Sequence, residues 1–187
     1  RDTPVPTPGP GQVRLRIDWV GICGSDLHYF YEGANGAFVV KEPLIPGHEV
    51  SGRIDFDPVG EWRQGTGVTV HPARFGAEQA KFAEDPHLWP GGSYLGSAST
   101  LPHTQGGLVE YLVVERSMVR VLPETLPVRR AVLAEPLAVA LHALAKAGGV
   151  RGRRVLVSGS GPIGLLTVAA AVAGGADEVT ATDVLPG

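Results

Sequence analysis

A glycine-rich turn near the end of the chain constrains the possible fold more than any other feature of the sequence. The turn reads Gly-Ser-Gly-Pro-Ile-Gly at residues 159–164. A largely apolar run at 153–157 has the length of a buried strand, residues 165–173 read as an apolar helix, and 178–183 read as a second strand. This order is typical of one βαβ unit. Because two parallel strands leave both faces of a sheet open, we expect the start of an α/β Rossmann domain that is truncated here.

The same turn predicts a dinucleotide site. Gly159 permits the tight turn, Gly161 lets a pyrophosphate approach the helix N-terminus, and Gly164 lets helix and strand pack closely. Asp183 ends the second strand, where a carboxylate accepts hydrogen bonds from a ribose diol and repels a 2′-phosphate, which favours NAD over NADP. The alternative is a glycine turn in an α/β protein that binds another ligand. The candidate cofactor-binding residues are Gly159, Gly161, Pro162, Ile163, Gly164 and Asp183.

The residues before this unit predict a different architecture. The chain of 187 residues holds 26 Gly and 16 Pro, a content that indicates many tight turns rather than long helices. Short strands are predicted at 13–17, 68–70 and 111–114, which favours a small, mostly β barrel or sandwich over residues 1–125. Residues 72–104 have no periodicity, and we expect an irregular lobe there that is functional or marks a lost site.

Between the two parts the sequence predicts a connecting helix within residues 126–150. Residues 131–147 are rich in Ala, with Leu at helical spacing and a Gly-Gly stop at 148–149, and Pro136 is expected to break this helix near its start. The predicted organisation is therefore a β domain at 1–125, a connecting helix at 126–150 and the βαβ unit at 151–187.

The overall charge and the cysteine content exclude several classes of partner. A formal net charge of -3 leaves no basic field, so we expect neither nucleic-acid binding nor attraction to anionic membranes. Residues 155–176 carry no charge and are long enough for a membrane span, but their glycines and Pro162 favour a strand, turn and helix. The single Cys23 forbids an intrachain disulfide, and no initiator Met or secretory leader is visible, so we expect a cytoplasmic protein.

Four residues are candidates for a metal site. One thiolate, one imidazole and carboxylate oxygens make a mixed set that suits zinc, and three ligands with an open fourth position suit catalysis. Each residue also has an ordinary structural interpretation, as a buried apolar thiol, a hydrogen-bonded turn histidine or a carboxylate at the end of an element. Spacing alone does not unite them. The candidates are Cys23, His48, Glu49 and Glu135.

Several motifs, taken together, resemble the zinc-dependent medium-chain dehydrogenase/reductase family in its polyol dehydrogenase branch. They are Gly-Ile-Cys-Gly-Ser-Asp-Leu-His-Tyr at 21–29, Pro-Gly-His-Glu-Val-Ser-Gly at 46–52, Ala-Glu-Pro-Leu-Ala-Val-Ala at 134–140 and the glycine turn. Residues 30–36, 95–98 and 101–107 are most similar to the L-idonate 5-dehydrogenase type of that branch, with sorbitol dehydrogenases next. The resemblance covers nearly the whole chain and implies a GroES-like barrel followed by a Rossmann domain.

The resemblance implies a role for each candidate metal ligand. Cys23, His48 and Glu49 correspond to the zinc ligands, with water or a substrate oxygen as the fourth. Glu135 corresponds to a carboxylate beside the metal that bonds the water or substrate, or that exchanges with Glu49 as a ligand. Asp26 corresponds to the carboxylate that orients the ligand histidine, a role such sites generally require.

Three further residues are implied to act on the substrate. Ser25 and His28 correspond to a relay that moves the alcohol proton outward, and Tyr29 corresponds to a side chain of the substrate pocket. Structural alternatives are open for these positions: Ser25 and Asp26 could cap a short helix after Cys23, and His28 and Tyr29 could be solvated surface.

The sequence departs from the family pattern in two respects. The irregular lobe contains no cysteine at 76–89, where the family often carries a structural zinc, so we expect one catalytic zinc and no structural zinc. Family members are also roughly twice as long. The resemblance therefore implies the N-terminal half of a zinc- and NAD-dependent oxidoreductase that acts on a small polyol or sugar acid, as a homo-oligomer at full length.

Two alternatives to that function are open. The first is a family member acting on another secondary alcohol, such as threonine or a butanediol. The second is a fragment without catalytic activity, and we expect the 187 residues alone to be inactive.

Overall fold

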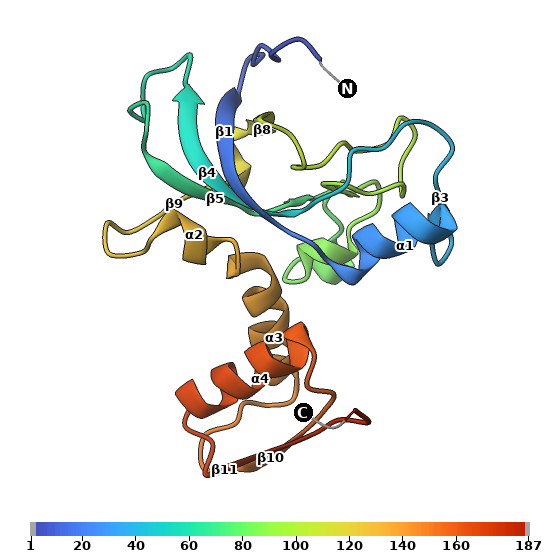
Figure 1. Ribbon diagram of the computed structural model, residues 1–187, viewed down its shortest axis with the longest axis vertical. Coiled ribbons are helices and arrows are strands. Elements are labelled where there is room, and N and C mark those ends of the chain that lie inside the picture. The colour runs from blue at the N-terminus through green and yellow to red at the C-terminus, as the bar shows by residue number, and fades with distance from the viewer. Residues whose placement is uncertain (1–2, 186–187) are drawn as a thin grey trace. The chain divides into compact units, whose positions relative to one another are not determined.

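The computed structural model describes residues 3–185, which divide into two compact units, one ending at Val132 and the other beginning at Leu133 (Figure 1). The division falls inside the predicted connecting segment at 126–150. Helix α2, Val128–Ala131, belongs to the first unit and packs against its sheet, whereas helix α3, Ala134–Lys146, belongs to the second unit and packs against helix α4, Pro162–Ala173.

The first unit is built on a curled antiparallel sheet of five strands in the order β8-β1-β4-β5-β9. The predicted strands at 13–17, 68–70 and 111–114 are present as parts of β1, β5 and β8. No pairing joins the two edge strands within residues 3–185, so the sheet curls like a barrel without closing by hydrogen bonds. The strands are β1 Gln12–Gly21, β4 Glu49–Phe56, β5 Gly67–Val70, β8 Tyr111–Glu115 and β9 Val119–Val121.

Alternating apolar side chains of these strands form the core inside the curl. Val13 and Leu15 of β1 point inward beside Leu112 and Val114 of β8, with Arg14 and Arg16 between them on the other face. Burying one such side chain contributes about 1.5–3 kcal/mol, which stabilises the unit mainly through this cluster. The remaining members of the cluster are Val50, Ile54, Val68, Val70, Leu95, Met118 and Val119.

The loops between the strands carry short elements. Helix α1, Gly24–Glu32, follows β1 directly, and the β2–β3 hairpin, Ala34–Asn35 with Phe38–Val39, follows α1. The irregular lobe predicted at 72–104 is present. Strands β6, Ala73–Arg74, and β7, Ser93–Tyr94, pair at its base, and two 3-10 turns lie between them in the sequence. These are η1, Ala80–Phe82, and η2, Pro86–Leu88; a third, η3, Arg116–Met118, separates β8 from β9.

The second unit contains the predicted βαβ order. Strands β10, Arg154–Ser158, and β11, Glu178–Thr182, are parallel, and α4 connects them. The prediction that Pro136 breaks the connecting helix is wrong. Pro136 lies in the first turn of α3, where a proline is tolerated because the N–H groups of the first turn have no partner within the helix. The interruption lies between α2 and α3 instead. Across residues 3–185, none of the helices combines the length and the apolar character that a membrane crossing requires.

Candidate metal centre and cofactor-binding turn

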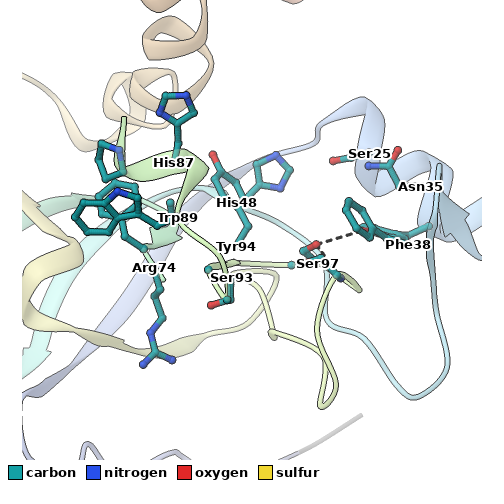
Figure 2. Close-up of a pocket in the computed structure, with 18 residues that line it drawn as sticks. Ser25, Asn35, Phe38, His48, Arg74, His87, Trp89, Ser93, Tyr94 and Ser97 are labelled. Atoms are coloured by element: carbon teal, nitrogen blue, oxygen red, sulfur yellow. Dashed lines mark hydrogen bonds between the residues drawn. The ribbon is translucent and has the colours of Figure 1, made fainter. Parts of the chain in front are cut away.

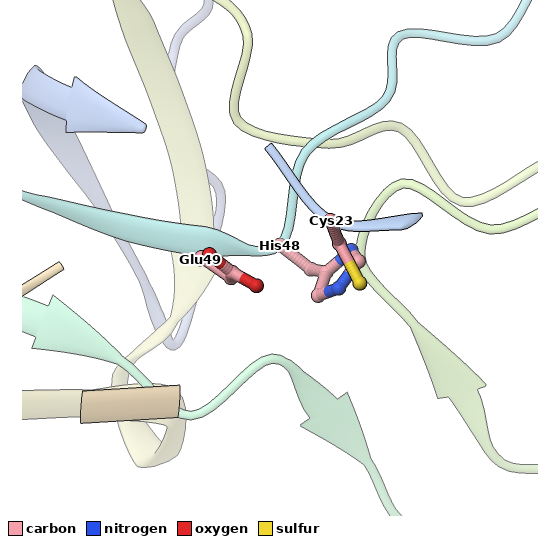
Figure 3. Close-up of side chains that lie close together, drawn as sticks. All are labelled: Cys23, His48 and Glu49. Carbon is pink, nitrogen blue, oxygen red and sulfur yellow. The ribbon is translucent and has the colours of Figure 1, made fainter. Parts of the chain in front are cut away.

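Three side chains that could bind a metal meet at one end of the sheet. Cys23 precedes α1, Glu49 is the first residue of β4, and His48 comes directly before it. The antiparallel pairing of β1 with β4 brings Gly21 opposite Glu49, so the chain after β1 lies beside the chain before β4. One ligand atom from each of Cys23, His48 and Glu49 lies within 4.8 Å of the other two (Figure 3). Within residues 3–185 this is the one such cluster.

The three donors fit zinc chemically and in size. Zinc binds thiolate sulfur at about 2.3 Å and imidazole nitrogen or carboxylate oxygen at about 2.0–2.2 Å, so ligand atoms around one ion lie within about 4 Å of each other. A cluster within 4.8 Å reaches that spacing with small side-chain rotations. His48 and Glu49 are buried, and Cys23 is partly exposed.

The electrostatic surroundings favour the thiolate form of Cys23. A hydrogen bond with the His48 side chain lowers the pKa of the Cys23 thiol, burial acts in the opposite direction, and hydrogen bonds with Ser25 lower it further. The net direction is downward. Because the thiolate is the form of cysteine that binds metals, this environment suits a metal ligand.

Asp26 connects the two segments that carry these side chains. One carboxylate oxygen of the buried Asp26 accepts the backbone N–H of Cys23 at 2.9 Å, and the other accepts the backbone N–H of Gly47 at 2.9 Å. The second oxygen is also 3.9 Å from Nδ1 of His48, which is beyond hydrogen-bond distance. Asp26 therefore helps to cap α1, which is one of the two alternatives for this residue, and its role in orienting His48 stays a prediction.

A cavity of about 590 Å³ opens beside His48. Figure 2 shows Ser25 and Asn35 at one end of it, His87 and Trp89 at the other, and His48 beside Tyr94 between them. The cavity gives the candidate metal centre a neighbouring volume in which a small substrate fits.

The residues implied to act on the substrate lie in different surroundings. Ser25 and Tyr29 line the cavity. Tyr29 is buried, and its hydroxyl accepts the backbone N–H of Ala98 at 3.2 Å, so the alternative that Tyr29 is solvated surface is wrong. His28 is exposed on α1, and its Nδ1 lies 2.9 Å from Oε1 of Glu32. Its surroundings are therefore those of the second alternative, a residue on the solvated surface.

Sequence reasoning missed the aromatic wall of the cavity. Tyr94 packs edge-on against His48 with ring centroids 5.5 Å apart, and Trp89 packs edge-on against Phe75 at 6.3 Å. Apart from His48, these aromatic residues belong to the irregular lobe at 72–104, for which the sequence predicted no regular structure. The concentration of aromatic residues in a segment without periodicity was the available signal.

The glycine turn has the geometry that its sequence predicts. Gly159 has a φ of 98°, a conformation that favours glycine, and a Cβ added to Gly164 would lie 1.9 Å from the carbonyl oxygen of Gly159. Gly161 caps α4, and a Cβ there would meet no atom within 4 Å, which leaves the helix N-terminus accessible. Pro162 is the first residue of α4, and Ile163 follows it with its side chain exposed.

Asp183 holds this turn from the end of β11. Its carboxylate accepts the backbone N–H of Ser160 at 2.6 Å and that of Leu185 at 3.2 Å. These backbone hydrogen bonds, with that of Ser160 the largest contribution, lower the pKa of the exposed Asp183. The carboxylate is therefore ionised at neutral pH and lies next to the candidate pyrophosphate turn. Glu135 lies in the first turn of α3, and its implied place beside the metal stays a prediction.

Comparison with known proteins identifies relatives over nearly the whole chain. Residues 9–124 match the family described as the alcohol dehydrogenase GroES-like domain. L-idonate 5-dehydrogenase (NAD(P)(+)) of Escherichia coli K12 is 40% identical over 173 residues, covering 92% of this chain and 50% of that protein. Sorbitol dehydrogenase of Gallus gallus is 40% identical over 187 residues, covering 97% of this chain and 51% of that protein.

A solved structure of one of these relatives has the same fold as this chain. The crystal structure of L-idonate 5-dehydrogenase from Escherichia coli K-12 superimposes with a TM-score of 0.87 at 38% identity, covering 94% of this chain and 51% of that one. The chain thus spans about half the length of the curated relatives it matches.

Proposed function

This chain belongs to the alcohol dehydrogenase GroES-like domain family, and we propose that it is the N-terminal half of a zinc-dependent oxidoreductase that oxidises a secondary alcohol of a polyol or aldonate with NAD. The observation that carries this proposal is the Cys23, His48 and Glu49 cluster, in which His48 also lines the cavity. The names of the two curated relatives, an L-idonate and a sorbitol dehydrogenase, support a polyhydroxylated substrate.

In this proposal Cys23, His48 and Glu49 would hold the zinc. The bound ion would supply Lewis-acid activation of the substrate hydroxyl, and a bound nicotinamide would supply the hydride acceptor. Asp26 keeps the segments around Cys23 and His48 in register through its two backbone hydrogen bonds. Glu135 bonds the substrate or water, or replaces Glu49 as a ligand.

The chain's own residues would remove the hydroxyl proton. Ser25 lines the cavity close to Cys23 and can accept a proton from a substrate hydroxyl while donating its own. His28, one turn along α1, is exposed and can pass a proton to solvent. Tyr29 shapes the cavity wall between these groups and the lobe.

The choice of NAD over NADP is proposed from Asp183. Its ionised carboxylate lies at the turn where the adenosine ribose would bind and would repel a 2′-phosphate. The relative from Escherichia coli carries both cofactors in its name, NAD(P)(+), so this preference belongs to the proposal for this chain.

The remaining assignments are also proposals. We propose one catalytic zinc and no structural zinc, because the lobe at 76–89 has no cysteine. We propose a cytoplasmic homo-oligomer, in which a single unpaired thiol fits a reducing compartment. Other secondary alcohols such as threonine or a butanediol, and a non-catalytic fragment, are the competing candidates.

A substrate panel combined with metal analysis tests the proposal. The full-length protein is loaded with zinc and assayed with polyols, aldonates, threonine and butanediols, with NAD and with NADP, while metal content is measured by mass spectrometry. We expect about one zinc per chain and the fastest NAD reduction with a polyol or aldonate. Zinc-loaded protein that oxidises no secondary alcohol would contradict the proposal.

A further inference from the structure

The last residue of β1 lies directly against the carboxylate of the candidate metal centre. Gly21 pairs with Glu49 across the β1–β4 ladder, two residues before Cys23. A Cβ added to Gly21 would lie 2.0 Å from Oε2 of Glu49 and 3.0 Å from both Cβ and Cδ of Glu49. The Glu49 side chain therefore occupies the space that any side chain at position 21 would need.

The kind of atom that a new Cβ would meet separates Gly21 from Gly52, the other glycine of the β1–β4 ladder. At Gly52, opposite Ile17 in the same ladder, a Cβ would lie 2.1 Å from the backbone oxygen of Arg16, so the strands themselves would have to move. At Gly21 the three nearest atoms all belong to the Glu49 side chain: Oε2 and Cδ can move by rotation, whereas Cβ of Glu49 is fixed to its backbone and would have to shift slightly. Gly21 is also absent from the glycines with positive φ among residues 3–185, so its backbone accepts alanine.

We infer that Gly21 is a positioning residue for Glu49: by lacking a side chain, it lets the carboxylate lie across the end of β1 toward Cys23 and His48. This inference rests on the proposed zinc site. Glu49 is 9% exposed, so few other directions are open to its side chain in the packed end of the sheet. A methyl group at position 21 would displace the carboxylate from the cluster, whereas the contact with Cβ of Glu49 at 3.0 Å asks for only a small shift at the end of the β1–β4 pairing.

Four variants of the full-length protein test this inference by zinc affinity, measured in competition with a chromophoric chelator. They are Gly21→Ala, Glu49→Ala, the double variant, and Gly24→Ala as the matched control, because a Cβ at Gly24 meets no atom within 4 Å. We expect Gly21→Ala to weaken zinc binding by roughly 10–100-fold, the range for losing the support of a metal ligand. Gly24→Ala should bind like wild type.

The double variant separates displacement of the carboxylate from damage to the strand. If Gly21 acts through Glu49, then adding Gly21→Ala to Glu49→Ala costs less than about twofold, because the displaced group is already gone. The thermal melting of the metal-free variants gives a second reading: any loss of stability in Gly21→Ala should be recovered when Glu49 is also alanine.

Three results would overturn the inference. They are zinc binding by Gly21→Ala within twofold of wild type, a loss that adds in full to that of Glu49→Ala, and a double variant that does not recover the stability lost in Gly21→Ala. Wild-type protein that binds no zinc would instead overturn the proposed function, so the two failures are distinguishable.

Discussion

Cys23 is the only thiol in the sequence, and the proposed metal centre depends on it at the scale of a single side chain. Other side chains of the protein also carry nitrogen and oxygen donors like those of His48 and Glu49, but Cys23 is the only source of a thiolate ligand. The hydrogen bond with His48 lowers the pKa of the Cys23 thiol in the metal-free protein, and this favours the thiolate form that binds metals.

Replacing Cys23 by serine should remove most of the bound zinc from a protein that otherwise holds about one ion per chain. A serine hydroxyl is not ionised at neutral pH, whereas a metal-bound cysteine is a thiolate. Metal content after dialysis checks this, with Ser117→Ala, a change at an exposed residue of η3, as a control that should retain its zinc. Unchanged zinc in Cys23→Ser would remove Cys23 from the site.

A second prediction at the scale of a single residue concerns Asp183 and the preference for NAD over NADP. In the full-length protein, Asp183→Ser combined with Val184→Arg should shift the ratio of kcat/KM values from NAD toward NADP by about tenfold or more. The change removes a charged hydrogen-bond acceptor for the ribose diol and adds a partner for the 2′-phosphate. Asp177→Ser, which removes another exposed carboxylate of the second unit, should leave the ratio unchanged. Wild type that prefers NADP would contradict the role given to Asp183.

Among the elements, the turn after β4 and the turn η3 are joined by a charged cluster. Arg116 donates hydrogen bonds to the buried Asp57 and, at 2.5 Å, to Glu61, and its guanidinium lies 4.2 Å from the ring centre of Trp62. Burial raises the pKa of Asp57, but hydrogen bonds from Arg116 and from the backbone N–H groups of Trp62 and Val59 outweigh it and lower that pKa to about 2. The ionised form of Asp57 therefore stabilises this connection.

Stability should depend on pH through this carboxyl group. Its folded-state pKa lies below the usual value near 3.9, so the stabilisation is fully present above about pH 4 and is lost as the pH falls toward 2. Asp57→Asn should lower the free energy of unfolding by about 1 kcal/mol at pH 6, after allowance for screening, and by much less at pH 2.

Urea unfolding of both proteins between pH 2 and 6 measures that difference. The exposed Glu124→Gln serves as the control, because its carboxylate lies on the surface and should show no such dependence. A difference between wild type and Asp57→Asn that stays constant over this range would be inconsistent with the cluster as described.

A further prediction at the scale of the elements concerns the irregular lobe, whose turns are joined by contacts of aromatic side chains. Nε1 of Trp89 donates to the carbonyl oxygen of Phe82 at 2.8 Å, which joins the end of η2 to η1, and the Trp89 ring packs on Phe75. Trp89→Phe should remove this hydrogen bond at a cost of about 1 kcal/mol and loosen the lobe locally.

Hydrogen exchange of the amides at 77–90 should therefore become faster in Trp89→Phe while zinc content stays the same. Trp19→Phe, on β1 outside the lobe, is the matched control and should leave those amides protected as in wild type. Faster exchange throughout the sheet in Trp89→Phe would show that the lobe is not an independent element.

At the scale of the whole molecule, the second unit lacks the layers that cover a parallel sheet. Leu156 of β10 and Leu165 of α4 are 69% and 59% exposed, and β10 and β11 form a sheet of two strands within residues 3–185. Parallel sheets are normally covered on both faces. The 187 residues alone should therefore bind NAD weakly, oxidise no polyol and tend to associate through this unit, while the first unit keeps its fold.

Isothermal titration of the isolated chain with NAD, together with a polyol oxidation assay, checks this expectation. Size-exclusion chromatography of the same material reports association, and the full-length protein provides the positive control for cofactor binding. Tight NAD binding or turnover by the isolated chain at ordinary concentrations would show that the second unit is complete enough to function.

The sequence by itself determined the features that depend on neighbouring residues. The glycine turn could be recognised because its geometry is local: the positive φ of Gly159 and the contact of Gly164 with the Gly159 carbonyl involve residues five positions apart. Strand β1 could be recognised from the alternation of apolar and charged residues at Val13, Arg14 and Leu15, since side chains of a strand alternate between its faces. Strand β8 could be recognised from its β-branched and aromatic residues. Family resemblance named Cys23, His48 and Glu49, but spacing did not unite them.

Only the tertiary structure decided how distant segments meet. The register that sets Gly21 against Glu49 includes a bulge between Ile17 and Trp19, and a shift of one residue would turn the Glu49 side chain to the other face. The burial of Tyr29 and the aromatic wall at Trp89 and Tyr94 depend on a lobe without periodicity packing beside α1 and β4. These contacts join residues tens of positions apart, and which of them form depends on how the whole first unit packs, which no local pattern encodes.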